Sequence, residues 1–307
     1  MLRKTALLVL IILVGWGSQS YATKYAGEFL SLGVGARALG MGSAYTGLAD
    51  DATASYWNPA GLSWVGEREL VLMHAEQFGD IANYDYGAYA QPFGENGTLS
   101  LSLVRLSIGD IPVTTGALND LNGNGVLDPG ETLNLDNIKM SSDAQNALYF
   151  SYGRHLSLKL KVGGSVKMIY KKTVDNHAWG LGLDVGAIYA LSPRLLVGVV
   201  LKDATSSPLV WDTEESTTET ITPSLRLGFA FTTGAPLGEV TLSGDLNTLF
   251  EGRNSAAQFG SDTVSGDLYF GLEYRLGQRV ALRLGNQEGD MTYGAGLNVR
   301  MFQIDYA

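Results

Sequence analysis

Hydrophobic residues alternate with small or polar residues in many short stretches of this 307-residue chain. In residues 239–246 every second residue is apolar or glycine, and the residues between them are Thr241, Ser243 and Asp245. A period of two predicts a β-strand with one apolar and one polar face. Such strands, repeated without helices between them, are what a transmembrane β-barrel requires, because a closed barrel satisfies its backbone hydrogen bonds inside a bilayer.

The pattern predicts thirteen strands and therefore an all-β fold, a transmembrane antiparallel β-barrel. We expect the strands at 67–75, 82–93, 98–107, 144–153, 158–172, 179–190, 195–203, 224–233, 239–248, 266–275, 280–286, 292–299 and 302–307.

Breaks between these strands alternate in length. Tight turns are expected at 94–97, 154–157, 191–194, 234–238, 276–279 and 300–301, whereas longer breaks occupy 104–143, 173–178, 204–223 and 249–265. Outer-membrane barrels place short turns in the periplasm and long loops outside the cell. A soluble β-sandwich has no reason to keep this phase.

Charged residues fall on the polar side of the strands, among them Lys161, Lys167 and Glu273. Charge is tolerated in a barrel lumen, whereas Arg or Lys on the lipid face costs about 2–4 kcal/mol at the midplane. We interpret these charges as a wetted barrel interior rather than as a specific binding site.

Bacterial single-chain barrels close with an even number of strands, so fourteen are expected where thirteen are counted. The sequence ends at Tyr306-Ala307, within a predicted strand. The prediction is that the last strand is missing from this sequence; the alternative is that one strand escapes the pattern.

The N-terminus predicts export. Arg3 and Lys4 precede the apolar run 6–14, and Ser20-Tyr21-Ala22 provides a cleavage site, so residues 1–22 read as a signal peptide. The alternative is a retained anchor, although the run is too short to span a bilayer as a helix.

Composition narrows the class of protein. The formal net charge is −10, which disfavours nucleic acid as a partner. The chain has no cysteine to accept a lipid or form a disulfide. Its 39 Gly, 15 Tyr and 10 Phe suit packed strands with aromatic girdles. We therefore expect the outer membrane of a Gram-negative-type bacterium, with its lipid as a partner.

Before the first strand, residues 33–62 are rich in glycine and do not alternate. Asn58-Pro59 followed by Gly61 predicts a turn, and Asp50-Asp51 fits a hydrogen-bonded turn better than a catalytic carboxylate pair. This segment reads as a plug rather than a strand.

Residues 35–42 (GARALGMG), 49–52 (ADDA) and 57–62 (WNPAGL) resemble the opening signature of the PorV/PorQ family, which is related to the FadL fatty acid transporters. The resemblance implies a fourteen-stranded barrel, residues 66–307, with residues 23–65 folded into the lumen as a hatch. It carries the hatch motif onto Asp50, Asp51, Asn58, Pro59 and Ala60.

The longest break contains a calcium motif. Residues 120–131 match the twelve-residue calcium loop, with Gly125 at the sharp turn. Its predicted metal ligands are Asp120, Asn122, Asn124, Val126, Asp128 and Glu131. No helices are predicted on either side, so we expect a stand-alone loop in which calcium is structural and shapes an outer-loop insertion at 108–142. The alternative is a polar turn without metal.

Nothing in the sequence predicts an enzyme. His74, His155 and His177 fall on separate strands or turns, and no Gly-x-Ser-x-Gly motif accompanies them.

Three functions remain open. The PorV/PorQ resemblance implies a non-enzymatic role in type IX protein secretion, with secreted cargo or secretion components as partners at the cell surface. The alternative is a FadL-like channel for passive uptake of hydrophobic molecules such as fatty acids, which would bind in the lumen. A soluble calcium-dependent adhesin is the third.

Overall fold

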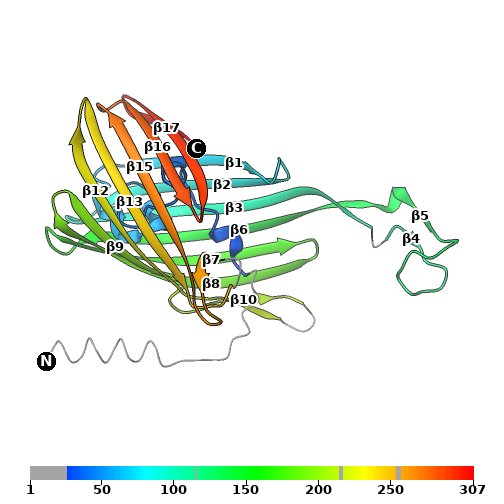
Figure 1. Cartoon of the computed structure of the whole chain (residues 1–307). Helices are drawn as coiled ribbons and strands as arrows, with labels where there is room; N and C mark the ends of the chain where they lie inside the picture. The colour runs from blue at the N-terminus through cyan, green and yellow to red at the C-terminus, as the bar shows by residue number, and fades with distance from the viewer. Residues whose placement is uncertain (1–25, 115, 214–216, 254–256) are drawn as a thin grey trace, which may run out of the picture.

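The computed structural model describes residues 26–114, 116–213, 217–253 and 257–307. The predicted signal peptide, 1–22, lies outside the described residues. Most of the described chain forms one curved antiparallel sheet that wraps around residues 26–65 (Figure 1). This confirms the predicted all-β fold.

Thirteen strands form the continuous path of this sixteen-stranded sheet, each pairing with its neighbours in chain order. They are β1 (Glu69–Gln77), β2 (Ala82–Phe93), β3 (Gly97–Val113), β6 (Lys139–His155), β7 (Leu160–Thr173), β8 (Asn176–Ser192), β9 (Leu195–Lys202), β12 (Ser224–Ala235), β13 (Gly238–Leu249), β15 (Ser265–Leu276), β16 (Val280–Gln287), β17 (Asp290–Val299) and β18 (Phe302–Tyr306).

Each of the thirteen predicted strands has its counterpart in this path. The largest differences are at β3 and β6, which continue to Val113 and begin at Lys139, so the break between them is shorter than the predicted 104–143. The register shifts between Ile108 and Ile111. This irregularity interrupts the alternation of apolar and polar residues, so the predicted strand ended too early.

Two of the predicted long loops contain short strands that pair with the main sheet. Residues 204–223 include β10 (Ser207–Trp211) and β11 (Thr218–Ile221), and 249–265 include β14 (Phe259–Gly260). β10 pairs with both β11 and β8. Such short strands form because a neighbouring strand offers an edge to pair with, and the hydrophobic pattern of the sequence does not indicate that edge.

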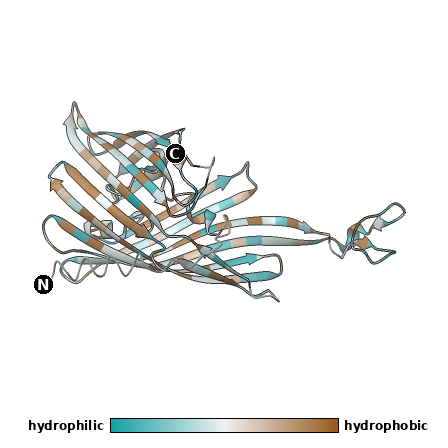
Figure 2. Ribbon diagram, turned by 60° about the horizontal axis from the view of Figure 1, so that its bottom comes forward, coloured by the Kyte–Doolittle hydropathy of each residue, from teal (hydrophilic) through white to brown (hydrophobic). Residues whose placement is uncertain are grey.

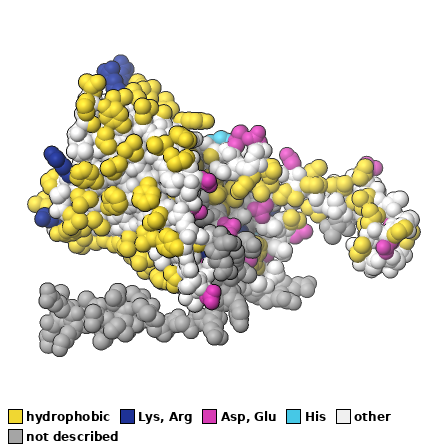
Figure 3. Space-filling model, in the orientation of Figure 1, with side chains coloured by type: hydrophobic (Ala, Val, Ile, Leu, Met, Phe, Trp, Pro, Cys, Tyr) yellow, Lys and Arg dark blue, Asp and Glu magenta, His cyan; other side chains and the backbone are white. Residues whose placement is uncertain are grey.

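The two faces of the sheet differ in polarity as predicted. Lys167, Asp184 and Glu273 point to the inside and are at most 2% exposed. Large apolar side chains such as Leu101 and Phe270 are about half exposed on the outer wall. Hydrophobic and hydrophilic residues alternate along the strands (Figure 2), and hydrophobic side chains cover most of the wall that is in view in Figure 3.

Residues 26–65, here called the inner segment, pack against the inside of the sheet (Figure 1). The segment holds only short helices: η1 (Glu28–Leu30), α2 (Ala36–Gly40), α3 (Ala54–Trp57) and η2 (Pro59–Trp64). No helix in the described part of the chain is long and apolar enough to cross a bilayer.

The sheet does not close among the described residues. β1 pairs with β2 and β18 pairs with β17, but β1 and β18 do not pair with each other. The predicted fourteenth strand has no counterpart in the described ranges.

The β3–β6 hairpin projects far beyond the rest of the sheet and ends in a small two-stranded ribbon (Figures 1 and 2). This ribbon pairs β4 (Leu118–Asn119) with β5 (Thr132–Leu133), and η3 (Leu135–Asn137) follows it. The tight turns lie at the opposite end of the barrel, so the hairpin extends from the side assigned to the cell exterior.

Candidate functional site in the barrel lumen

The Asn58-Pro59-Ala60 turn lies directly against wall glycines. A Cβ added at Gly163 of β7 would lie 2.3 Å from the Pro59 carbonyl carbon, and one at Gly186 of β8 would lie 2.1 Å from Asn58 Oδ1. Only glycine leaves room for such close backbone contact. The wall is thus shaped to receive this turn, a complementarity that the sequence did not reveal.

Asn58 is fully buried and holds the turn together by its side chain. Its Nδ2 donates to the Thr46 carbonyl at 2.9 Å, and its Oδ1 accepts from the Ala60 amide at 3.2 Å. Both sides of the carboxamide are therefore used, one within the turn and one to a neighbouring loop. Proline follows at the first position of η2, where no amide donor is needed.

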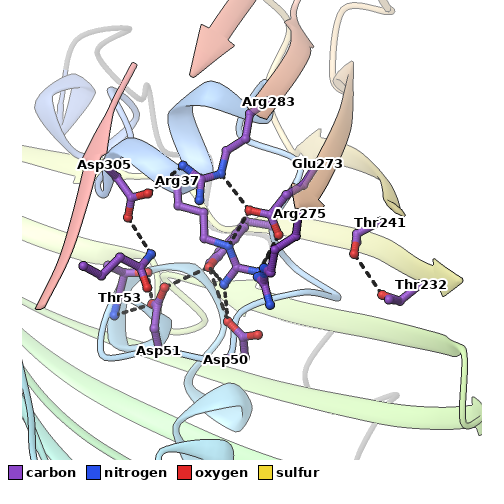
Figure 4. Close-up of polar contacts among 12 residues, drawn as sticks. Arg37, Asp50, Asp51, Thr53, Thr232, Thr241, Glu273, Arg275, Arg283 and Asp305 are labelled. Atoms are coloured by element: carbon purple, nitrogen blue, oxygen red, sulfur yellow. Dashed lines mark hydrogen bonds and ion pairs between the residues drawn. The ribbon is translucent and has the colours of Figure 1, made fainter. Parts of the chain in front are cut away.

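Arg37 of α2 joins the inner segment to the wall (Figure 4). Its Nε and Nη2 donate to the two carboxylate oxygens of Glu273 on β15, at 3.1 and 3.2 Å. Its Nη1 donates to Asp50 Oδ1 at 2.6 Å and to Tyr45 Oη at 2.9 Å. The arginine side chain is 10% exposed and that of Glu273 1%, so this two-point pair lies away from bulk water.

Glu273 is shared by two further arginines of the wall. Arg283 Nε donates to Glu273 Oε2 at 2.7 Å, and Arg275 Nη2 donates to Oε1 at 2.9 Å. Arg283 also pairs with Asp305 of β18 at 2.7 Å. One carboxylate therefore holds three guanidinium groups, from α2, β15 and β16 (Figure 4).

Asp51 has a different role from Asp50. Its Oδ1 accepts from the Thr53 amide at 2.9 Å and from the Thr53 hydroxyl, and its Oδ2 accepts from Tyr45 Oη at 2.8 Å. Asp51 thus closes a local turn, while Asp50 neutralises Arg37. The two carboxylates serve structural contacts in this arrangement.

A second ion pair holds the middle of the inner segment. Asp245 Oδ2 on β13 accepts from the Tyr45 and Thr46 amides, both at 3.0 Å, and from Arg226 Nε on β12 at 2.9 Å. Arg226 also donates to the Ser43 carbonyl. Backbone groups that have no helix or sheet partner are satisfied by the wall instead.

A third charged cluster lies in the wall itself. Lys167 Nζ lies 3.0 Å from Asp184 Oδ1 and 2.7 Å from Asp203 Oδ2. Nearby, Lys202 Nζ lies over the Tyr56 ring, 4.1 Å from its centroid. Among the described residues, no carboxylate forms an ion pair with Lys202.

Apolar and aromatic side chains fill the part of the lumen near the long loops. Phe29 is 2% exposed, and its carbonyl accepts from Tyr84 Oη at 3.2 Å. Trp57 is also buried, in edge contact with Tyr56 at 5.0 Å between ring centroids. Other members of this cluster are Leu30, Leu32, Leu106, Ile108, Tyr149, Leu209 and Ile221.

The predicted calcium loop, 120–131, lies exposed at the tip of the projecting hairpin, between β4 and β5. Asp120 accepts backbone amides of Asn122, Gly123 and Gly125, at 3.2, 2.6 and 2.7 Å. These amides, that of Gly125 most strongly, lower the pKa of the Asp120 carboxyl. Gly125 has a positive φ of 74°, as its place in the turn requires.

The remaining predicted ligands of this loop also face one another. Asn122 and Asn124 donate through Nδ2 to Asp128 Oδ2, at 2.7 and 2.8 Å, and they lower the pKa of Asp128. Glu131 accepts the Leu121 and Asp128 amides, both at 2.9 Å. No three His, Cys, Asp or Glu side chains gather as a metal group in the described ranges. The donor set depends on amide and carbonyl oxygens as well, which suit calcium.

The three histidines lie far apart in the sheet and have separate partners. His74 contacts Asp85, His155 contacts the Ser63 carbonyl, and His177 contacts Tyr170. In these contacts none of them meets a serine hydroxyl or another histidine.

The pairing of Arg37 with Glu273 was not predicted from the sequence. Each residue lies in a segment that the sequence pattern singles out: Arg37 in the glycine-rich stretch, and Glu273 on the polar face of a predicted strand. One signal was available, because Glu273 and Arg275 lie two residues apart on the same polar strand face. Nothing in the pattern indicated that Arg37 would be a partner of Glu273.

No family model and no curated protein sequence matches this chain. Several solved structures resemble it. The toluene transporter TbuX of Ralstonia pickettii is 15% identical with a TM-score of 0.55, covering 89% of this chain and 92% of its own. The toluene transporter TodX of Pseudomonas putida is 12% identical with a TM-score of 0.56, covering 89% and 91%. A FadL homologue of Pseudomonas aeruginosa is 10% identical with a TM-score of 0.53, covering 89% and 88%.

At these identities the likeness establishes the fold. The chain has the architecture of FadL-type outer-membrane channels along most of its length, in agreement with the FadL part of the sequence resemblance. Two of the neighbours named above, TbuX and TodX, are described as toluene transporters.

Proposed function

We propose that this protein lets small hydrophobic molecules cross the outer membrane through its lumen. The observation that carries the proposal is the apolar cluster around Phe29 in the outer half of the barrel. A water-filled porin would have polar side chains there. Ligand sites for apolar molecules are instead concave and lined by hydrophobic and aromatic side chains with few polar groups.

Residues of the inner segment occupy that cluster in the structure. Phe29 and Leu30 fill apolar space that an incoming molecule could take, and Tyr84 anchors Phe29 only through its carbonyl oxygen. We infer that the ligand replaces these side chains and that the inner segment acts as the hatch of the channel. Solved structures of the same fold include toluene and monoaromatic hydrocarbon channels, which supports this class of ligand.

Lys202 suggests which hydrophobic molecules are favoured. It lies beside the cluster over Tyr56, and no carboxylate of the described chain pairs with it. Lys202 is half-buried. A cation that is partly withdrawn from water without an acidic partner is costly, and a bound carboxylate would offset that cost. A molecule with an apolar body and a carboxylate end, such as a fatty acid, satisfies both features.

Uptake by Gram-negative cells that lack their own channels for these compounds tests the proposal. We expect cells with the protein to take up labelled palmitate and labelled toluene faster than cells with an empty vector. Lys202→Gln should slow palmitate uptake and leave toluene uptake unchanged. Lys139→Gln, on the exposed part of the hairpin, is the matched control. Uptake no faster than in vector cells contradicts the proposal.

A second candidate is the PorV/PorQ-like role in type IX secretion. The projecting β3–β6 hairpin favours it, because this hairpin offers a surface well clear of the membrane. The candidate predicts that shortening the hairpin blocks release of type IX cargo in a host with that system. It also predicts that palmitate uptake is unaffected by the same change.

We also propose that calcium shapes the hairpin tip. Residues 120–131 contain a full set of oxygen donors, and the polar contacts already bend the backbone around them. Bound calcium would be held by Asp120, Asn122, Asn124, Val126, Asp128 and Glu131 and would supply a positive charge to this acidic loop.

A further inference from the structure

An apolar groove of about 560 Å³ crosses the outer wall of the barrel, on the side away from the lumen. It runs from β2 across β3, β6 and β7 to β8. Its sides are Leu101, Phe150 and Val166 in one row and Leu99 and Tyr152 in the next. Leu101, Phe150 and Val166 are each 46–51% exposed, so the groove opens toward the membrane.

Two glycines create this groove. Gly164 takes the place of an outward side chain between Tyr152 and Val185, and a Cβ added there would find no atom closer than 3.5 Å. Tyr152 leans the other way, because a Cβ at Gly97 would lie 2.3 Å from its hydroxyl oxygen. The wall is therefore hollow at Gly164 because glycine has no side chain there, while the pairing of the strands continues unbroken.

A cation lies at the end of the groove near the tight turns. Arg154 follows Tyr152 by two residues on the same outward face of β6, which corresponds to about 7 Å along a strand. Arg154 is exposed, and it takes part in no ion pair among the described residues. An apolar groove that leads to a free guanidinium matches a molecule with an apolar tail and an anionic head.

We propose that this groove binds one phospholipid of the periplasmic leaflet, with an acyl chain over Gly164 and the phosphate at Arg154. The tight turns mark the periplasmic end of the barrel, and that leaflet consists of phospholipid. The Tyr152 ring lies between groove and guanidinium, at the level where aromatic residues meet lipid head groups. Because this site is on the outer wall, it is independent of what passes through the lumen.

Native mass spectrometry of the detergent-purified protein, titrated with phosphatidylglycerol, tests this site. We expect one lipid to stay bound to the wild-type protein at collision energies that remove all others. Gly164→Leu should weaken that binding about fourfold or more, since it excludes at least one methylene group of the chain. Gly164→Ala should give a smaller loss in the same direction, and Arg154→Gln should also weaken binding.

Gly87→Leu is the matched control. Gly87 faces outward on β2, and a Cβ there meets only Leu72 at 3.6 Å, so leucine adds the same apolar surface outside the groove. Its lipid retention should equal that of the wild type. Equal retention in wild type, Gly164→Ala and Arg154→Gln would mean non-specific annular lipid only and would overturn the proposal, even if Gly164→Leu does not fold.

Discussion

Arg37 and Glu273 are separated by 236 positions in the chain, yet their side chains form a two-point ion pair inside the barrel, at 3.1 and 3.2 Å. The pair links α2 of the inner segment to β15 of the wall. Because Glu273 also holds Arg275 and Arg283, removal of this one carboxylate affects three cations at once.

Glu273→Gln should therefore destabilise the barrel strongly. Breaking a buried ion pair from one side leaves uncompensated charge and costs about 3–5 kcal/mol. We expect a lower urea midpoint for unfolding in lipid vesicles, measured by tryptophan fluorescence and by gel mobility without boiling. Glu95→Gln in the exposed β2–β3 turn should leave the midpoint unchanged. A midpoint equal to wild type for Glu273→Gln would show that the cluster is not a stabilising contact.

Gly163→Ala should displace the Asn58-Pro59 turn from the wall. The new Cβ would lie 2.3 Å from the Pro59 carbonyl carbon, and overpacking of this kind costs about 1–3 kcal/mol. We expect faster cleavage of the inner segment by protease added to the purified protein. Gly164→Ala is the control, because the adjacent residue faces outward and meets nothing closer than 3.5 Å. Equal cleavage of the two variants would contradict the seating of the turn.

A reversible disulfide should show whether the inner segment moves during uptake. Ser55 of α3 and Ser102 of β3 have hydroxyl oxygens 2.9 Å apart, and the chain has no cysteine of its own. Oxidised Ser55→Cys/Ser102→Cys should take up palmitate more slowly, and reduction should restore the rate. The control pair Ser151→Cys/Ser165→Cys joins two wall strands, whose hydroxyls are 2.7 Å apart. Unchanged uptake by the oxidised first pair would indicate a route that leaves the segment in place.

Calcium should protect the hairpin tip from proteolysis. We expect limited digestion to cut between residues 108 and 142 more slowly with calcium than with chelator. Glu131→Gln should abolish the difference, because it removes the bidentate carboxylate at the last ligand position. Asp136→Asn, outside the twelve-residue loop, should keep it. Cleavage at the same rate with and without calcium would falsify the metal site.

The barrel strands were predictable because their cause is local. A strand between lipid and a polar interior must alternate, and β2 therefore begins at Ala82 and ends at Phe93 as the pattern predicts. β10 and β14 were not predictable in this way. They are short, and each exists because a neighbouring strand offers an edge.

The same distinction applies to the candidate site: some of its residues were predictable from the sequence, and their partners were not. The motif around Asn58 and the carboxylates Asp50 and Asp51 stood out as residues, since glycine and proline limit what their backbone can do. Their partners did not stand out. Nothing local indicates that Gly163 and Gly186 must be small because a turn from far earlier in the chain lies on them.

Alternation along the chain by itself determined that this protein is built of β-strands with polar residues on one face and apolar residues on the other, since strand period is set by backbone geometry within a few residues. Only the tertiary structure decided which charged side chains form ion pairs. It also decided that Lys202 has no carboxylate partner among the described residues and that Gly164 leaves a hollow in the outer wall. These features depend on strand register and on the seating of the inner segment, which bring together residues that are distant in the sequence.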